Sequence, residues 1–177
     1  MIFRDLGPVR QVAYVVHDVR AAMTHWTNVL GVGPFFLFED APIMDFEYRS
    51  KPCKARLSVA FANTGLLQIE LVQPLDDEPS AFREFLDSGR EGQQHIAYWT
   101  EDLDHWVDRA RKAGLPIVHS GYTGAPDGRF VYVDTRGLNG TMLEISEVRG
   151  RKKQFFEQVA QIAATWDGSD PVRRAGI

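Results

Sequence analysis

Four polar side chains stand where strand geometry would bring them together: Gln11, Glu70, His95 and Glu144. Each lies in a short apolar run typical of a buried β-strand, where every second side chain points to the same face. Two carboxylates, an imidazole and an amide oxygen are ligand types for a divalent cation, and carboxylates also move protons. The set therefore indicates a metal site with acid–base chemistry.

Each of these residues also has a simpler interpretation. A glutamate on a strand usually faces solvent or is hydrogen-bonded, and a single histidine is usually structural. Two glutamates in a concave, partly dry site repel each other, so protonation of one carboxyl or a cation must compensate their charge. We expect a cation, because an internal repeat places the four residues symmetrically.

That repeat has an offset of 84 residues. The run Gln-Val-Ala-Tyr-Val-Val-His-Asp-Val from Gln11 matches His-Ile-Ala-Tyr-Trp-Thr-Glu-Asp-Leu from His95. The eighth residue of each run is an aspartate suited to a helix N-cap, Asp18 or Asp102, and apolar side chains at helical spacing follow. Each copy therefore predicts a strand followed by a capped amphipathic helix, with a glycine after the last turn.

Strand-like runs separated by turn residues follow each of these helices. They cover residues 35–38, 56–62 and 66–72 in the first half, and 116–119, 129–134 and 141–146 in the second. Each half is thus a βαβββ module. One module alone would expose an edge and a bare face, so we predict an α+β fold in which two modules pair into an eight-stranded, barrel-like sheet with helices outside.

The predicted organisation divides the chain into four segments. Residues 1–75 form the first module, 76–92 a linker with a short helix at 80–86, 93–147 the second module, and 148–177 a C-terminal helical extension.

The extension contains a long helical segment from Arg149 to Trp166 that lies outside the repeat. We expect this helix to pack on the sheet or on a dimer partner, and a lid over the cavity is the alternative. Its first turn carries Arg149, Arg151, Lys152 and Lys153, where the helix dipole disfavours positive charge. We expect a solvated basic turn, with a bound phosphate as the alternative.

Strand alternation decides which side chains point inward. In the last strand of the first module, Leu67, Ile69 and Leu71 share the face that covers the helices, so Glu70 takes the other face. Glu144 is placed in the same way in the second module. The repeat then relates Gln11 to His95 and Glu70 to Glu144 across an approximate twofold axis.

These segments resemble the vicinal oxygen chelate superfamily, which includes glyoxalase I, methylmalonyl-CoA epimerase, extradiol dioxygenases and bleomycin-resistance proteins. The resemblance covers roughly Val9 to Val148, and the epimerases are the nearest group. Three motifs carry it: Gln-Ile-Glu-Leu-Val-Gln-Pro-Leu from Gln68, Gly-Gln-Gln-His-Ile-Ala-Tyr from Gly92, and Thr-Met-Leu-Glu-Ile from Thr141.

The resemblance implies a divalent ion, Mg, Mn, Co, Ni or Zn, held by Gln11, Glu70, His95 and Glu144, with open positions for two substrate oxygens. Gln11 departs from the family, which usually has histidine there. Either its amide oxygen binds and the site favours harder cations such as Mg²⁺ or Mn²⁺, or it hydrogen-bonds a neighbouring ligand and metal affinity is low.

The family's general base has no counterpart in this chain, because residues 54–63 contain no carboxylate. Glu47, Tyr48 or a metal ligand that detaches are the substitutes we consider. Phe35, Phe36, Trp99 and Tyr132 are candidates for apolar walls of the cavity, although aromatic residues on strands more commonly belong to the core.

A cation on a carbonyl oxygen would stabilise the enolate formed when the adjacent carbon loses a proton, with Glu70 or Glu144 as the base. We therefore predict a metal-dependent isomerase, epimerase or lyase acting on a small carbonyl compound or thioester. The alternative is a metal-free protein that binds or sequesters a small molecule, as bleomycin-resistance proteins do. In that case Glu70 and Glu144 hydrogen-bond Gln11 and His95.

Other enzyme classes fit less well. An extradiol dioxygenase needs two histidines and a carboxylate around iron, and on the predicted inner face only His95 qualifies. A nucleophilic hydrolase lacks both a Gly-x-Ser-x-Gly elbow and a histidine suitably placed for Cys53.

Composition sets the remaining expectations. The 177 residues include 20 basic and 24 acidic side chains, for a net charge of −4, so no general attraction to nucleic acid or anionic lipid is expected. The longest uncharged stretch, 21–38, is too polar to span a membrane, the first residues do not resemble a secretory signal, and the single cysteine precludes an internal disulfide. We expect a cytoplasmic homodimer with a small-molecule substrate.

Overall fold

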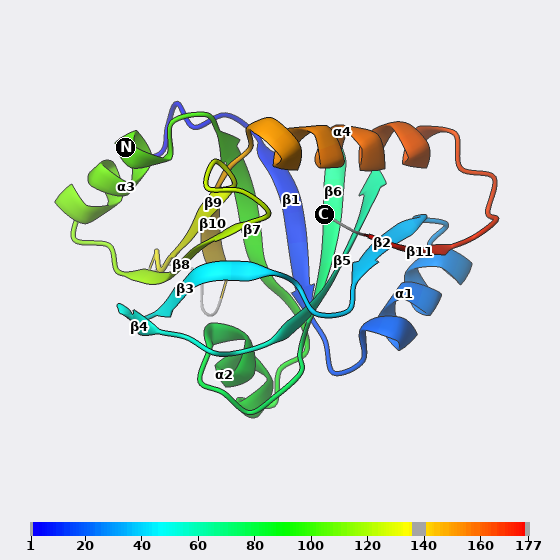
Figure 1. The fold of residues 1–177 in the computed structure, drawn as a ribbon, viewed down its shortest axis with the longest axis horizontal. Coiled ribbons are helices and arrows are strands. Elements are labelled where there is room, and N and C mark those ends of the chain that lie inside the picture. The colour runs from blue at the N-terminus through cyan, green and yellow to red at the C-terminus, as the bar shows by residue number, and fades with distance from the viewer. Residues whose placement is uncertain (1, 136–140, 176–177) are drawn as a thin grey trace.

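The computed structural model describes residues 2–135 and 141–175 (Figure 1). Its strands are β1 (Val9–Val15), β2 (Phe35–Phe38), β3 (Ile43–Tyr48), β4 (Lys51–Pro52), β5 (Leu57–Thr64), β6 (Leu67–Pro74), β7 (Gly92–Thr100), β8 (Ile117–Thr123), β9 (Arg129–Val133), β10 (Met142–Glu147) and β11 (Val172–Arg174). The helices are α1 (Val19–Asn28), α2 (Ala81–Asp87), α3 (Leu103–Lys112) and α4 (Gly150–Ala164). None of these helices is long and apolar enough to cross a bilayer.

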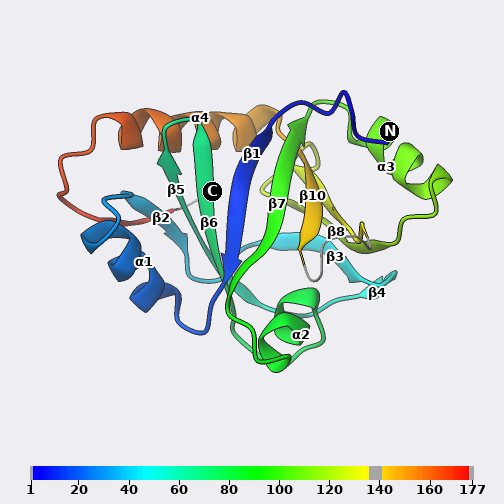
Figure 2. The ribbon, with the colours of Figure 1, turned by 180° about the vertical axis from the view of Figure 1, so that it is seen from behind.

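All the described strands form one curved sheet in the order β11-β2-β5-β6-β1-β7-β10-β9-β8-β3-β4. The first strands of the two halves, β1 and β7, pair antiparallel at its centre, and each is flanked by the parallel last strand of its own half, β6 or β10. Two βαβββ units joined in this way, with α1 and α3 outside, confirm the predicted fold class (Figure 2).

The local signals that predicted α1 and α3 act as expected. The Asp18 carboxylate accepts hydrogen bonds from the N–H groups of Arg20 and Ala21, and the Asp102 carboxylate accepts one from His105. The apolar face of α1 packs on the outer side chains of β6, and that of α3 on those of β10. The opposite faces of β6 and β10 are therefore left to the interior of the curve.

The sheet contains more strands than the eight predicted, because β3, β4 and β11 were not foreseen. β3 leaves the first half and pairs with β8, the outer strand of the second half, with Tyr48 opposite His119. A register irregularity lies between Met44 and Glu47, where Asp45 has a φ of 46°. This bulge interrupts the alternation by which a strand is recognised from sequence.

The C-terminal extension runs across the sheet. α4 begins directly after β10 and crosses toward β5, where the rings of Phe155 and Phe156 lie 5.9 and 5.5 Å from that of Phe61 (Figure 1). β11 then adds in parallel to β2. The prediction that the helix packs on the sheet is confirmed, and α4 also forms one wall of the central cavity.

Candidate active site

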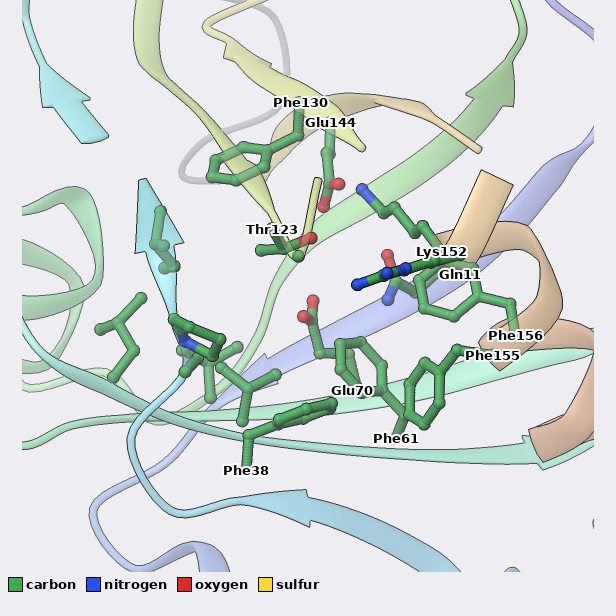
Figure 3. A pocket seen from close by; sticks show the side chains of 18 of the residues that line it. Gln11, Phe38, Phe61, Glu70, Thr123, Phe130, Glu144, Lys152, Phe155 and Phe156 are labelled. Carbon is green, nitrogen blue, oxygen red and sulfur yellow. The ribbon is translucent and has the colours of Figure 1, made fainter. Parts of the chain in front are cut away.

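Glu70 of β6, His95 of β7 and Glu144 of β10 meet on the inner face of the sheet (Figure 3 labels the two glutamates). His95 Nε2 lies 3.1 Å from a Glu70 carboxylate oxygen and 3.3 Å from one of Glu144. One possible ligand atom from each residue lies within 4.8 Å of the others, and all three side chains are buried. Both halves of the chain therefore contribute to one cluster.

The strand register explains why these side chains can meet. Ala13 is the partner of Glu70 in β6 and of His95 in β7, while Ala97 is the partner of Gln11 in β1 and of Glu144 in β10. Both alanines are fully buried, and their small side chains leave room between the longer ones. The repeated alanine of the two copies thus makes space at the approximate twofold axis.

Gln94 orients the imidazole of His95. Its amide oxygen lies 2.7 Å from His95 Nδ1, and because an amide oxygen only accepts, Nδ1 carries the hydrogen. Consecutive β1 residues Ala13 and Tyr14 pair with His95 and Gln93, so Gln94 is the extra residue of a bulge. The sequence interpretation missed this contact, because strict alternation points Gln94 to the opposite face.

Gln11 lines the same cavity but is not within the three-residue cluster. Its amide nitrogen donates a 2.9 Å hydrogen bond to the Gln68 side-chain oxygen. Gln68 is not one of the proposed ligands, so this bond is not the contact with a neighbouring ligand that we considered. Only the amide oxygen of Gln11 is chemically suited to bind a cation.

The surroundings of the cluster shift the pKa values of its two carboxyls in opposite directions. Burial raises the pKa of Glu70 despite the hydrogen bond to His95. Burial also opposes ionisation of Glu144, but the hydrogen bond and charge of His95, with the charge of Lys152, outweigh it and lower that pKa. Burial lowers the pKa of His95, yet its hydrogen bonds to Glu144 and Glu70 raise it overall to about 9.

Lys152 enters the cavity from the first turn of α4 and points toward Glu144 (Figure 3). Its ammonium donates to Ser146 Oγ at 2.6 Å and to the Gly128 carbonyl at 3.4 Å. The expected solvated basic turn is therefore wrong for Lys152, although Lys153 does pair with Glu101 at the surface. The reason is that α4 turns one face of its first turn onto the sheet.

The cavity has a volume of about 440 Å³ and is walled mainly by apolar side chains, eight of which are aromatic (Figure 3). These are Phe38, Phe46, Phe61, Phe82, Phe130, Tyr132, Phe155 and Phe156. Of the four wall candidates taken from the sequence, Tyr132 alone is among them. Phe35 and Phe36 are buried core residues, and Trp99 stacks behind Phe156 at 5.0 Å.

Of the substitutes considered for the general base, Glu47 and Tyr48 do not reach this cavity, whereas the predicted metal ligands Glu70 and Glu144 line it. The exposed side chain of Glu47 accepts a hydrogen bond from Ser120 Oγ at 3.2 Å on the far side of β3. Tyr48 packs its ring on His119 at 4.8 Å, and burial raises its pKa. Both hypotheses are wrong, because the bulge in β3 turns Phe46 inward instead.

Comparison with known proteins places the chain in a family. The family model described as the glyoxalase/bleomycin resistance protein/dioxygenase superfamily matches residues 10–133. The chain belongs to this superfamily. An ethylmalonyl-CoA/methylmalonyl-CoA epimerase of Cereibacter sphaeroides is 30% identical over 148 residues, covering 81% of this chain and 99% of that protein.

Solved structures of the superfamily share the fold. Methylmalonyl-CoA epimerase from Mycobacterium tuberculosis superposes with a TM-score of 0.58 at 22% identity, covering 82% of this chain and 91% of that one. A methylmalonyl-CoA epimerase in complex with methylmalonyl-CoA and NH4⁺ gives a TM-score of 0.54 at 18% identity, covering 78% and 92%.

Members of this superfamily typically bind a divalent metal, and the donors of the cluster fit such an ion. With Nδ1 of His95 held as a donor by Gln94, Nε2 is left as the ligand atom, an arrangement common for metal-binding histidines. Two carboxylates complete a mixed nitrogen and oxygen set.

Proposed function

We propose that this superfamily member is an acyl-thioester epimerase, which removes the proton from the carbon next to a thioester carbonyl and returns it to the opposite face. The observation that carries the proposal is the meeting of Glu70, His95 and Glu144 in one buried cluster that opens into an apolar cavity. The relatives named methylmalonyl-CoA epimerase support it, since they span most of the chain.

In this proposal Glu144 and Glu70 act as the base and the acid of the proton transfer. Glu144, kept ionised by His95, accepts the α-proton as the C–H bond breaks, and the electron pair moves onto the carbonyl oxygen. Glu70, whose burial favours the protonated form, returns a proton to the other face of the carbon. The aromatic walls exclude water, which would otherwise exchange with the transferred proton.

A divalent ion held by His95, the amide oxygen of Gln11 and the ionised carboxylates of Glu70 and Glu144 would supply Lewis-acid stabilisation of the negative charge on the carbonyl oxygen. A glutamate that carries the transferred proton is detached from the ion. This ligand set and the metal dependence are part of the proposal.

Proton exchange in deuterated water tests this function. We expect the wild-type protein to incorporate deuterium at the α-carbon of methylmalonyl-CoA, measured by proton NMR, and to lose the rate after chelation. Glu144→Gln should slow exchange about a thousandfold, because general acid–base catalysis contributes 10²–10⁴-fold. Elemental analysis of the same samples should find roughly one divalent ion per chain and its loss in the variant.

Glu47→Gln is the matched control, because Glu47 is a glutamate near the site that does not line the cavity. It should leave the exchange rate unchanged. Equal rates for the wild type and Glu144→Gln would contradict the proposal, as would a wild-type protein that exchanges no acyl thioester.

A second candidate function is metal-free binding of a small molecule. The specific observation in its favour is that Lys152 and a protonated His95 supply two positive charges for the two carboxylates, so their charge is balanced without an ion. Protein that stays metal-free in excess Mn²⁺, Ni²⁺ and Zn²⁺ and exchanges no proton would favour this function over the epimerase. Homodimerisation and a cytoplasmic location also remain proposals.

A further inference from the structure

Lys152 belongs to a part of the chain that neither copy of the repeat contains. It lies on α4, beyond residues 10–133 that the superfamily model matches. Its ammonium is nevertheless directed into the cavity on the side of Glu144 (Figure 3). The extension therefore adds the positive charges of Lys152 and of its exposed neighbour Arg151 to a cavity whose two glutamates come from the sheet.

The protein itself supplies Lys152 with neutral partners. Its hydrogen bonds go to a hydroxyl and a carbonyl oxygen, and the rings of Phe130 and Phe156 lie 5.8 and 5.9 Å from the ammonium. Among the described residues no carboxylate lies within the 4.0 Å of an ion pair, whereas the next residue, Lys153, has Glu101 at 3.3 Å. An ammonium in aromatic surroundings has lost much of its hydration, so an anion that enters the cavity gains a strong partner.

If Lys152 were absent, the cavity beside the two glutamates would be unfavourable for an anion. Glu70 and Glu144 both line the cavity, and either carboxylate repels an incoming one. A substrate acid group close to the reacting carbon would have to lie near these two residues. Lys152 is positioned to offset that repulsion, while the aromatic and aliphatic side chains of the wall can contact hydrocarbon.

We propose that Lys152 binds a free carboxylate on the acyl part of the substrate and so selects malonyl-type thioesters, which carry a second acid group on the reacting carbon. This inference rests on the proposed function, since it assigns the substrate class of the same site. The carboxylate would become a third partner of the ammonium, next to Ser146 and Gly128. Lys152 is thus a specificity-determining residue.

Paired ligands test the assignment directly. Methylmalonyl-CoA and propionyl-CoA share the whole coenzyme portion and differ in the free carboxylate. Their dissociation constants are measured by calorimetry for the wild type, Lys152→Met and Lys153→Met, with the metal content of each sample determined. Lys153→Met removes the same charge from the same turn of α4 without touching the cavity.

We expect Lys152→Met to weaken methylmalonyl-CoA binding about tenfold or more and to change propionyl-CoA binding less than about twofold, because a desolvated charge pair is lost in one case only. Lys153→Met should alter neither. If Lys152→Met does not fold, Lys152→Gln replaces it, and circular dichroism verifies the fold. Equal weakening of both ligands, no weakening, or wild-type protein that binds propionyl-CoA as tightly would overturn the assignment.

Failure of the two proposals is distinguishable. Wild-type protein that binds methylmalonyl-CoA through Lys152 without exchanging its α-proton contradicts the epimerase function and leaves the carboxylate site standing. Exchange that proceeds in Lys152→Met with an unchanged KM contradicts the carboxylate site and leaves the epimerase function standing.

Discussion

Two histidines in this protein are equally buried and have opposite chemistry. His95 and His119 both have no exposed surface, and both contact Tyr132 and Phe82. The carboxylates of Glu70 and Glu144 raise the pKa of His95 to about 9, whereas burial lowers the pKa of His119 to about 4. Burial alone therefore does not identify the functional histidine.

The difference comes from what each ring nitrogen meets. His119 Nδ1 donates to the Glu47 carbonyl at 2.8 Å, and Nε2 accepts the Ala81 N–H at 3.0 Å, so the neutral ring satisfies the backbone of β3 and α2. The ring is also stacked between Phe46 and Phe82. His119 is a structural link, while His95 keeps one nitrogen directed at two acids.

Replacing each histidine by asparagine should give the largest difference in activity between two variants. His95→Asn should lower the rate of α-proton exchange about a thousandfold, because the group that holds Glu144 ionised is lost. His119→Asn should lower the melting temperature and leave the rate of the folded protein within about threefold. NMR exchange and thermal unfolding measure both. Equal rate losses in the two variants would remove the functional distinction between the rings.

The free energy of unfolding of the protein, measured with a chelator present to remove metal, should depend on pH because His95 and His119 both have shifted pKa values. The folded-state pKa of His119, about 4, is below its ordinary value of 6.5, so its contribution is lost as pH falls from 6.5 to 4. His95, with a folded-state pKa of about 9, contributes below pH 6.5 and loses that contribution as pH rises through 9. Each histidine contributes about 3 kcal/mol at most to the free energy of unfolding.

Denaturant unfolding as a function of pH measures these two effects. His119→Gln should flatten the acid side of the profile and leave the alkaline side in place. His25→Gln, a change at an exposed histidine, is the control and should preserve both sides. An unchanged acid side in His119→Gln would show that other groups cause it.

The orientation of His95 by Gln94 predicts a smaller effect. Gln94→Leu removes the acceptor for the Nδ1 hydrogen and should weaken divalent metal binding about 10–100-fold, the usual cost of losing such a contact. Titration with Mn²⁺ or Zn²⁺ measures the affinity, and Gln93→Leu, at the neighbouring exposed position, is the control. Equal affinities in both variants would mean that Gln94 does not orient a ligand.

The smallest effect is expected from a substitution that gives the first strand of each half a histidine at the equivalent position. Gln11→His places an imidazole at the position that the repeat relates to His95, and should tighten Zn²⁺ binding about tenfold if residue 11 is a ligand. An unchanged affinity would place residue 11 outside the ligand set. The measurement is competition with a zinc chelator.

Local sequence signals were enough to predict the eight strands of the two repeated units and the inner face of the central ones. Strand alternation placed Glu70 and Glu144 correctly, since each follows a regular run whose other face packs on a helix. The bulges at Asp45 and Gln94 were beyond such reasoning, because an extra residue in a strand is specified by its neighbours across the sheet. The cavity wall was missed for the same reason, as most of its aromatic side chains come from segments distant in sequence.

The sequence by itself determined the two capped βαβββ units and the direction of the polar side chains on their central strands, because these depend on periodicity and on contacts within a few residues. Only the tertiary structure decided that β3 crosses to β8, that His119 is neutral, and that α4 brings Lys152 to the site. Such outcomes depend on which surfaces of distant segments are buried together, and no local pattern encodes that choice.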